Sequence, residues 1–475
     1  MTISTDSDLC HLSASEAQLL FRQRRLSPVE LLAAQRQAIE RLDPDLNAMR
    51  STRFEAALDA ARESERRYMG NGPVRALEGV TTLLKNEHNL VGEETDQGSL
   101  LLAGQVDTTN APITQRLLDA GAVIHGRTQV PEFYMAAFTR SVAHGVTRNP
   151  WNPAVTCGGS SGGSGSALAA GMACLSTASD IGGSIRVPSA YCGVVGFKPS
   201  YGRVPEAAFQ FALNTHNHNG LMCRSVDDAA LMFNVISGPH RCDPAVIRPK
   251  LELSPPVPDV RGMRIAWSMD LGYFDVDPDV QRNTLETVRM LREAGAVVEE
   301  VELGWDGRVP KAFTDALVFV LGKGLARAIA DAPPDQISDY VLRMAGMSAD
   351  ITAEDHLDAI HVLGEMHEAM QRVMDRHELL LCPTLARNTC PAEGVSNAHD
   401  DLLRNAMTYP FNMLSRHPVL AVPSGFASNG VPTGVQLVGQ TFSEASVLRV
   451  GAALEPLVGW RQWRPTLARS ADVRA

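Results

Sequence analysis

Two groups of serines lie in glycine-rich sequence within one stretch of the chain. Ser160 and Ser161 follow Gly158-Gly159, and Ser184 follows Asp180-Ile181-Gly182-Gly183. Glycine lets backbone N–H groups face a site that a side chain would otherwise block. A hydroxyl beside exposed N–H groups provides the nucleophile and the oxyanion hole that acyl transfer needs. The stretch therefore predicts an acyl-transfer centre.

The first glycine-rich run, residues 158–163, has three other interpretations. A flexible linker would be flanked by polar sequence, but an apolar, helix-compatible segment follows at Ala167–Leu175. The run also matches G-x-S-x-G, the nucleophile elbow of α/β-hydrolases, which would make Ser160 the nucleophile and would need a downstream acid and histidine. Available histidines are His216, His218 and His417, and no local pattern selects one. A P-loop is disfavoured because the Gly-Lys-Ser/Thr ending is missing.

A longer pattern resembles the amidase signature family of serine hydrolases. It consists of GGSSGGS at 158–164 and ASDIGGSIRVPSAYCGVVGFKPSYGRVP at 178–205. Similar segments are GVTTLLKN at 79–86, NPWNP at 149–153 and GVPTGVQLVG at 430–439. The resemblance covers most of the chain and is weakest from about 240 to 375.

The resemblance implies a Ser–Ser–Lys triad made of Ser184, Ser160 and Lys85. Ser184 would be the nucleophile, and Ser160, held through a cis peptide bond, would bridge it to Lys85. Neutral Lys85 would accept the Ser184 proton through Ser160 and later return it to the leaving amine. The tetrahedral oxyanion would lie against the backbone N–H groups of Ile181, Gly182, Gly183 and Ser184.

The proposed base must be an unusual lysine. Free lysine has a pKa near 10.4, so only about one in 2,500 is neutral at pH 7. Desolvation or a second cation lowers that pKa. The segment before Lys85, Val80–Leu84, reads as a buried strand and fits desolvation. Without the other matches, a surface lysine next to Asn86 and Glu87 would be the simpler interpretation.

Other residues near the two serine groups receive supporting roles. The resemblance implies that Asp180 and Arg186 hold the glycine loop, although a plain structural ion pair explains them equally well. Ser161 is expected to hydrogen-bond the triad region, and Ser179 stands where the family more often has threonine, which also supplies a hydroxyl. The loop after the motif predicts substrate contacts, with an exposed polar loop as the alternative, for Phe209, Phe211, His216 and His218.

Composition restricts the class of protein. The chain has 475 residues, 44% of them hydrophobic and 20% charged, and a formal net charge of −11. These values are typical of a globular protein with a sizeable core, and the negative charge disfavours nucleic-acid binding. The eight cysteines show no zinc spacing, and His356 and His361 are badly spaced for one helical face, so no metal and no cofactor are expected. No leader segment or apolar run of about 18 residues is present, which predicts a cytoplasmic protein without a membrane partner. A monomer or a homodimer is expected.

The elements that position the site follow an α/β pattern. We expect helices from Ser13 or Ser15 to about Arg25, from Ser27-Pro28 past Leu42, and over residues 51–68. Further along the chain we expect helices over 113–120, 226–236 and 277–294, and strands over 122–126, 173–178, 264–267, 297–301 and 379–381. This alternation predicts a wound α/β core, and the resemblance implies a central twisted mixed β-sheet covered by helices. Residues 310–376 read as mostly helical and are expected to cover the site and shape a pocket.

The expected organisation is a single amidase signature domain over residues 1–475. Within it, 1–70 would supply N-terminal helices, 71–240 the core with the motif, 241–400 a more variable substrate side, and 401–475 a return to the core. The resemblance implies a cofactor-independent hydrolase of small-molecule amides, with esters or carbamates (urethanes) as further substrates. The A subunit of a glutamine-dependent amidotransferase and an α/β-hydrolase-type esterase using Ser160 remain as alternatives.

Overall fold

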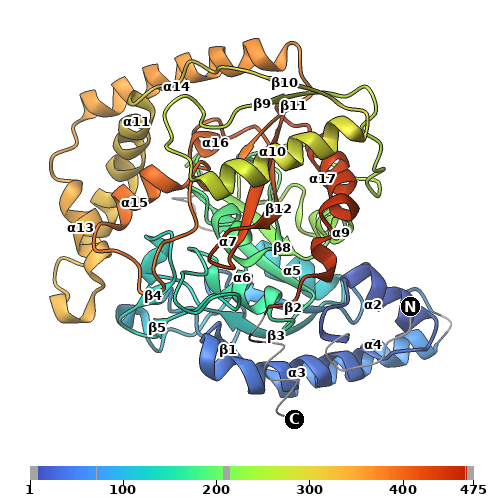
Figure 1. The fold of residues 1–475 in the computed structure, drawn as a ribbon. Coiled ribbons are helices and arrows are strands. Elements are labelled where there is room, and N and C mark those ends of the chain that lie inside the picture. The colour runs from blue at the N-terminus through green and yellow to red at the C-terminus, as the bar shows by residue number, and fades with distance from the viewer. Residues whose placement is uncertain (1–8, 71, 207–213, 466, 468–475) are drawn as a thin grey trace.

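A single eleven-stranded sheet forms the centre of the protein (Figure 1). The structure is a computed structural model and describes residues 9–70, 72–206, 214–465 and 467. In spatial order, the strands are β1 (Met49–Thr52), β3 (Val123–Thr128), β2 (Thr81–Lys85), β6 (Leu175–Asp180), β8 (His218–Cys223), β7 (Val195–Lys198), β12 (Val419–Phe426), β13 (Pro432–Gly439), β11 (Leu379–Pro383), β9 (Arg264–Trp267) and β10 (Val297–Glu300). A separate two-stranded sheet joins β4 (Arg140–Ser141) to β5 (Gly145–Val146).

The sheet is mixed, and its parallel part positions the chemistry. Strand β2 runs parallel to β3 on one side and to β6 on the other. Parallel neighbours end at the same edge of a sheet, so Lys85 at the end of β2 and Asp180 at the end of β6 emerge together. Strand β8 runs antiparallel to β6 and begins at that edge, where His218 pairs with Asp180. The predicted mixed α/β core is confirmed.

Helices cover both faces of the sheet. They are α2 (Ala14–Arg22), α3 (Pro28–Leu46), α4 (Phe54–Met69), α5 (Pro112–Asp119), α6 (Gly162–Ala169), α7 (Arg186–Cys192), α9 (Val226–Ile236), α10 (Pro278–Glu293), α11 (Arg308–Leu317), α12 (Lys323–Ala328), α13 (Asp339–Met347), α14 (Ala353–Met374), α15 (Ala398–Asn405), α16 (Pro410–Met413) and α17 (Glu444–Val458). Alternation along β8 shows the two layers. Leu221 and Cys223 join the core that includes α9 and α17, whereas Met222 joins the core of α6 and α7.

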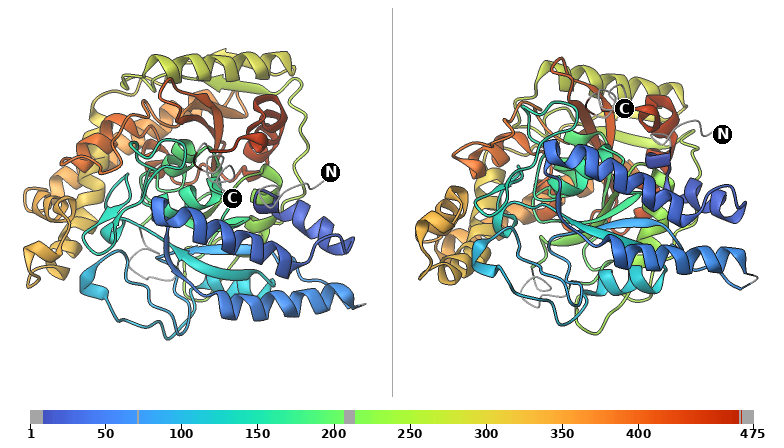
Figure 2. Two further views of the ribbon diagram at one scale, coloured as in Figure 1. Left: turned by 60° about the horizontal axis from the view of Figure 1, so that its bottom comes forward. Right: turned by 90° about the horizontal axis from the view of Figure 1, so that it is seen from below.

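The N-terminal helices follow from their capping residues. Ser27 caps α3: its hydroxyl accepts from the Glu30 N–H, while the Glu30 carboxylate accepts from the Ser27 N–H, which satisfies two donors that a helix start leaves unpaired. Ser13 caps α2 in the same way. Helix α2 ends at Arg22, earlier than predicted, because Arg24 takes a left-handed conformation with φ 55°. Helices α3 and α4 lie side by side beneath β1–β3, as the two further views show (Figure 2).

The predicted helical region at 310–376 is confirmed and lies at the opposite end of the molecule from α3 and α4 (Figure 1). Helix α11 packs along α14, and a π-helical turn, η3 (Val318–Gly322), joins α11 to α12. No helix in the described ranges combines the length and the apolar character that crossing a membrane requires.

Candidate active site

Lys85 is a fully buried lysine with three polar partners. All five residues of β2 are buried, because their apolar and β-branched side chains suit a strand between two others. The Lys85 amine lies 2.9 Å from Ser160 Oγ, 2.7 Å from Ser179 Oγ and 2.9 Å from Glu87 Oε2. A buried ammonium without partners would be very costly, so these contacts explain how the sheet tolerates this side chain.

Burial and charge act on Lys85 in opposite directions. Burial lowers the pKa of Lys85 below that of free lysine, while the adjacent Glu87 carboxylate opposes the shift. Burial would raise the pKa of Glu87, but the charge of Lys85 and the hydrogen bond from the Ser179 hydroxyl hold it below its usual value. Glu87 is therefore ionised at neutral pH, and Lys85 is easier to deprotonate than a surface lysine.

Ser160 and Ser161 occupy the turn that enters α6. The Gly159–Ser160 peptide bond is cis, as the resemblance implied, and both serines are buried. The Ser161 N–H donates to the Ser184 carbonyl at 3.2 Å, so the two serine groups meet in space. Position 159 must be glycine, because a Cβ there would lie 2.5 Å from the Phe138 carbonyl oxygen.

The segment from Ile181 to Ser184 connects β6 to α7. None of its four N–H groups donates to an acceptor within the described residues. Gly183 has φ +136°, and a Cβ there would lie 2.1 Å from Thr408 Oγ1. Ser184 is 8% exposed and lines a pocket together with Ile181 and Gly182. The segment thus presents unpaired N–H groups beside an accessible hydroxyl.

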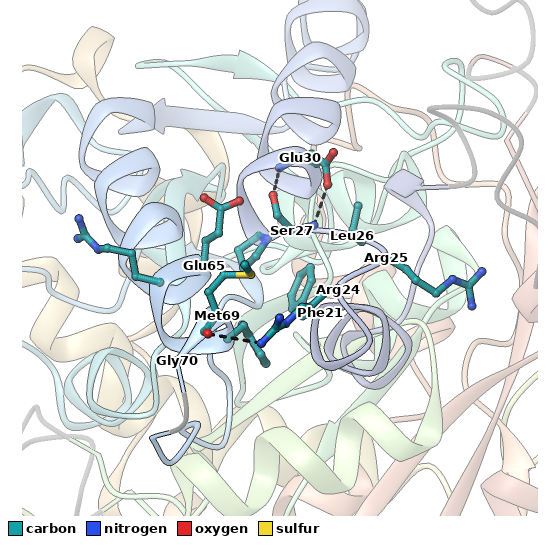
Figure 3. Close-up of a pocket in the computed structure, with 12 residues that line it drawn as sticks. Phe21, Arg24, Arg25, Leu26, Ser27, Glu30, Glu65, Met69 and Gly70 are labelled. Atoms are coloured by element: carbon teal, nitrogen blue, oxygen red, sulfur yellow. Dashed lines mark hydrogen bonds between the residues drawn. The ribbon is translucent and has the colours of Figure 1, made fainter.

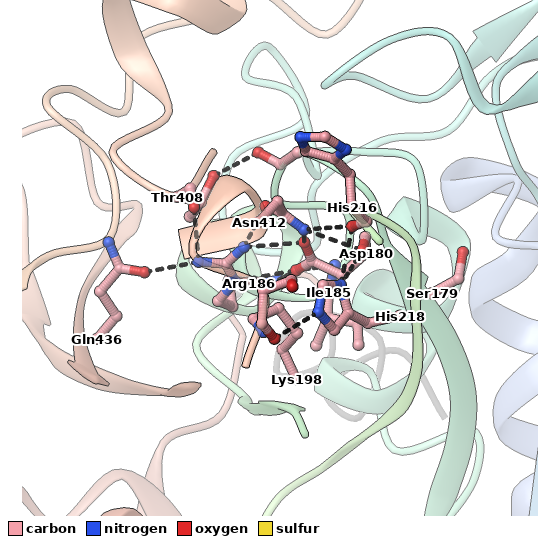
Figure 4. Close-up of polar contacts among 12 residues, drawn as sticks. Ser179, Asp180, Ile185, Arg186, Lys198, His216, His218, Thr408, Asn412 and Gln436 are labelled. Atoms are coloured by element: carbon pink, nitrogen blue, oxygen red, sulfur yellow. Dashed lines mark hydrogen bonds and ion pairs between the residues drawn. The ribbon is translucent and has the colours of Figure 1, made fainter. Parts of the chain in front are cut away.

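The buried ion pair between Asp180 and Arg186 joins the two ends of this segment (Figure 4). Arg186 Nη2 donates to Asp180 Oδ1 at 2.9 Å and Arg186 Nε donates to Oδ2 at 3.0 Å. Burial alone would raise the pKa of Asp180, but the Arg186 guanidinium and the Asn412 amide hold it far below its usual value. The remaining Arg186 donors reach the Thr408 carbonyl, the Gln436 side chain and the Asn412 side chain.

His216 and His218 belong to this network. The Asn412 amide donates to the His216 carbonyl, and the ring nitrogens of His218 lie 2.8 and 2.9 Å from the carbonyl oxygens of His216 and Ser415. Burial lowers the pKa of His218 to about 3, so the ring is neutral. Neither histidine is among the described residues lining the Ser184 pocket, and their contact with substrate stays a prediction. Phe209 and Phe211 lie outside the described residues.

The pocket beside Ser184 is lined mainly by apolar groups, with Tyr134 and His399 as further polar members. Its side chains come from the chain before β4, from the Ile181–Ser184 segment, from the helical region that was expected to shape a pocket, and from α15. The lining residues are Tyr134, Met135, Ala136, Ala137, Ile181, Gly182, Ser184, Phe313, Leu317, Leu321, Met344, Ala398, His399 and Leu402. The space that this lining encloses is small, about 40 Å³.

Larger cavities lie elsewhere, and two of them bear on the search for a site. One, of about 720 Å³, is formed by residues between Phe21 and Gly70 of the N-terminal helices (Figure 3); it contains no residue of the Lys85–Ser160–Ser184 group. The other, of about 330 Å³, is polar and lies on the Lys85 side, where Glu87, His88, Glu206 and Asn219 line it. Tyr134 lines both this cavity and the Ser184 pocket. The described residues include no group of three His, Cys, Asp or Glu side chains placed to hold a metal ion.

A family model for amidases matches residues 30–448. The chain belongs to the amidase signature family. An acylamidase of Rhodococcus erythropolis is 33% identical over 97% of this chain and 98% of its own length. The A subunit of the glutamyl-tRNA(Gln) amidotransferase of Chloroflexus aggregans is 31% identical over 98% of this chain and 100% of its own length.

Solved structures of the family superpose closely on this one. A bacterial aryl acylamidase of the amidase signature family matches with a TM-score of 0.88 at 29% identity, covering 98% of this chain and 99% of that one. The 6-aminohexanoate cyclic dimer hydrolase, solved with its substrate, matches with a TM-score of 0.83 at 28% identity, covering 97% and 99%. The α/β fold and family membership predicted from the motifs are confirmed, and the chain is an amidase-family hydrolase.

Several residues of the site escaped sequence reasoning. Thr408, Asn412 and Gln436 contact Arg186 from more than 200 positions away, and only Gln436 lies in a segment that resembles the family. In the sequence alone, a glutamate such as Glu87 is expected to lie at the surface. Its signal is its place two residues after Lys85, just beyond the strand end, where a carboxylate is close enough to pair with the amine.

Proposed function

We propose that this protein hydrolyses the C–N bond of small-molecule amides through an acyl-enzyme on Ser184. The observation that carries the proposal is the contact of the buried Lys85 amine with the Ser160 hydroxyl at 2.9 Å, next to a serine loop with unpaired N–H groups. This supplies a base, a bridging hydroxyl, a nucleophile and an oxyanion hole in one place.

The reaction follows from these positions. Ser184 Oγ attacks the amide carbonyl carbon while its proton passes to Ser160 and the Ser160 proton passes to neutral Lys85. The N–H groups of Ile181, Gly182, Gly183 and Ser184 stabilise the oxyanion. Collapse breaks the C–N bond, and the proton returns from Lys85 through Ser160 to the leaving amine. Water then attacks the acyl-enzyme by the same proton path and releases a carboxylic acid.

The apolar pocket favours substrates with an aliphatic or aromatic group beside the scissile carbonyl. Aryl amides are the first choice, in keeping with the names of the relatives. Esters and carbamates pass through the same tetrahedral geometry, so the same residues are competent for both. A hydrolysis screen with one arylalkyl acyl group presented as primary amide, anilide, p-nitrophenyl ester and aryl carbamate tests this proposal. Release of acid by the wild type but not by Ser184→Ala is expected.

Two outcomes would overturn the assignment. Adduct formation with a serine-directed probe that survives Ser184→Ala but not Ser160→Ala would make Ser160 the nucleophile. Activity seen only with glutamine and added partner proteins would favour the A subunit of an amidotransferase. That second candidate is favoured by the 31% identity to such a protein, and disfavoured by the apolar lining around Ser184, which offers few partners for a glutamine side chain.

A further inference from the structure

Glu87 closes a triangle of polar contacts around the Lys85 amine. Glu87 Oε2 accepts from Ser179 Oγ at 2.5 Å and lies 2.9 Å from Lys85 Nζ, and Ser179 Oγ lies 2.7 Å from the same nitrogen. The Glu87 side chain is 15% exposed and lines the polar cavity, whereas Lys85 is fully buried. The carboxylate is the member of the triangle closest to solvent.

The donors and acceptors of the triangle orient the lysine. A neutral amine has two N–H donors and one lone pair. The Glu87 carboxylate only accepts, so it takes one N–H. The Ser179 hydroxyl uses its single proton on Glu87, so its oxygen accepts the second N–H. The third neighbour at hydrogen-bond distance, Ser160 Oγ, then faces the lone pair.

We propose that Glu87 is a positioning residue that aims the lone pair of neutral Lys85 at the Ser160 hydroxyl, directly and through Ser179. The inference rests on the proposed function, because it assumes that Lys85 withdraws a proton from Ser184 through Ser160. It adds Glu87 and Ser179 as residues that orient the base without carrying the transferred proton.

The carboxylate has a second effect, on the pH range of activity. Its charge stabilises the ammonium form, so the amine deprotonates at higher pH with Glu87 than without it. The other ionised groups facing Lys85 are farther from it: Asp180 is paired with Arg186, and Glu206 accepts from Asn217 and Asn219. His88 and Tyr134 are neutral, since burial lowers the pKa of His88 and raises that of Tyr134.

The test measures the rate at which a fluorophosphonate labels Ser184 as a function of pH. Labelling forms an O–P bond, expels fluoride and transfers the Ser184 proton toward Lys85, so it reports activation of the nucleophile without any amide substrate. Glu87→Gln is expected to move the acidic limb of the profile down by about 1–3 pH units. It should also lower the plateau rate by about 10- to 100-fold, because a misaimed base is costly.

Matched variants separate charge from orientation. Glu87→Asp keeps the negative charge but shortens the side chain. The acidic limb of the labelling profile should therefore stay at the same pH, while the plateau labelling rate falls. Ser179→Ala removes the relay and should do the same. Glu206→Gln removes a nearby carboxylate that does not touch the amine, and its limb shift should be much smaller than that of Glu87→Gln. Thermal unfolding midpoints identify any variant that fails to fold. If Glu87→Gln fails to fold, the plateau labelling rates of Glu87→Asp and Ser179→Ala decide whether Glu87 positions Lys85.

The possible outcomes separate a failure of the proposed role of Glu87 from a failure of the proposed function. Wild type that is never labelled at Ser184 contradicts the proposed function. Wild type that is labelled, with a Glu87→Gln profile reduced equally at every pH and an unmoved limb, contradicts only the role of Glu87. Unchanged plateaus in both Glu87→Asp and Ser179→Ala would also overturn it.

Discussion

The amine of Lys85 lies 2.9 Å from the hydroxyl of Ser160, although 75 positions separate the two residues. One comes from the end of a central strand and the other from the turn before α6. Because the strand is buried on both sides and the lysine is fully buried, its chemistry depends on the groups that the fold brings to it.

Replacing Lys85 tests the base directly. Lys85→Met keeps the length and removes the amine, so kcat should fall by about 10²–10⁴-fold with a smaller change in KM. Steady-state kinetics on the best substrate of the screen measure this. The control is Lys198→Met, which removes another fully buried lysine; within the described residues its amine donates to the backbone carbonyl groups of Pro199 and His417. A control with an equal loss of kcat would indicate general damage instead.

Adding one methyl group at Gly183 should disable the glycine loop. The φ of +136° and the 2.1 Å approach to Thr408 Oγ1 leave no room for alanine, so Gly183→Ala should cost more than about 1 kcal/mol of stability and most of the activity. Gly346→Ala is the matched control, because a Cβ there meets nothing within 4 Å and α13 should gain up to about 1 kcal/mol. Chemical denaturation and kinetics report both; equal behaviour would contradict the oxyanion-loop geometry.

Breaking the buried Arg186–Asp180 pair should be strongly destabilising. Arg186→Met leaves a charged Asp180 without its partner, which costs about 3–5 kcal/mol. Urea denaturation at pH 7 measures the loss. Arg289→Met, which removes an exposed ion pair with Glu286, should leave the unfolding midpoint almost unchanged.

The same pair predicts a pH dependence of stability. The pKa of Asp180 is lower in the folded protein than in the unfolded chain, so its stabilisation is complete above the ordinary aspartate pKa near 3.9 and declines as pH falls below it. Asp180→Asn should flatten this part of the stability curve. Denaturation midpoints between about pH 5 and pH 2.5 measure it, and an identical slope in the variant would contradict the prediction.

The apolar pocket should determine the preferred acyl or aryl group. Leu321→Ala enlarges the pocket next to Ser184 and should reduce kcat/KM for arylalkyl amides by about 10-fold, since each buried methylene contributes about 0.8 kcal/mol. Short acetyl amides should be much less affected. Leu342→Ala, an exposed position on α13, serves as the control. Equal losses of kcat/KM for acetyl amides and arylalkyl amides would show that the bulky group of the substrate does not bind in this pocket.

The buried setting of Lys85 was predictable from the apolar strand before it, and helix starts such as Ser27 needed only capping rules. The roles of Ser160, Ser184 and Lys85 were expected from the resemblance to the family and stay predictions, because the local G-x-S-x-G pattern alone favoured Ser160 as the nucleophile. The residues that hold the loop were not predictable, because Thr408 and Asn412 contact Arg186 from 222 and 226 positions away and no local sequence pattern marks them. Burial of His216 and His218 in that network likewise depends on how β8 pairs with β6. Glu87 was visible in the sequence, but its importance depends on Ser179 lying across from it.

The reach of Arg186 has a consequence for synthesis of the protein. Its partners Thr408, Asn412 and Gln436 follow it by 222, 226 and 250 positions. At about 5–20 residues per second, a ribosome needs roughly 12–50 s to supply the last of them after Arg186. During that time the nascent chain carries Ser184, the proposed nucleophile, without the contacts of Arg186 that hold its loop. The enzyme should therefore remain inactive until translation is nearly complete.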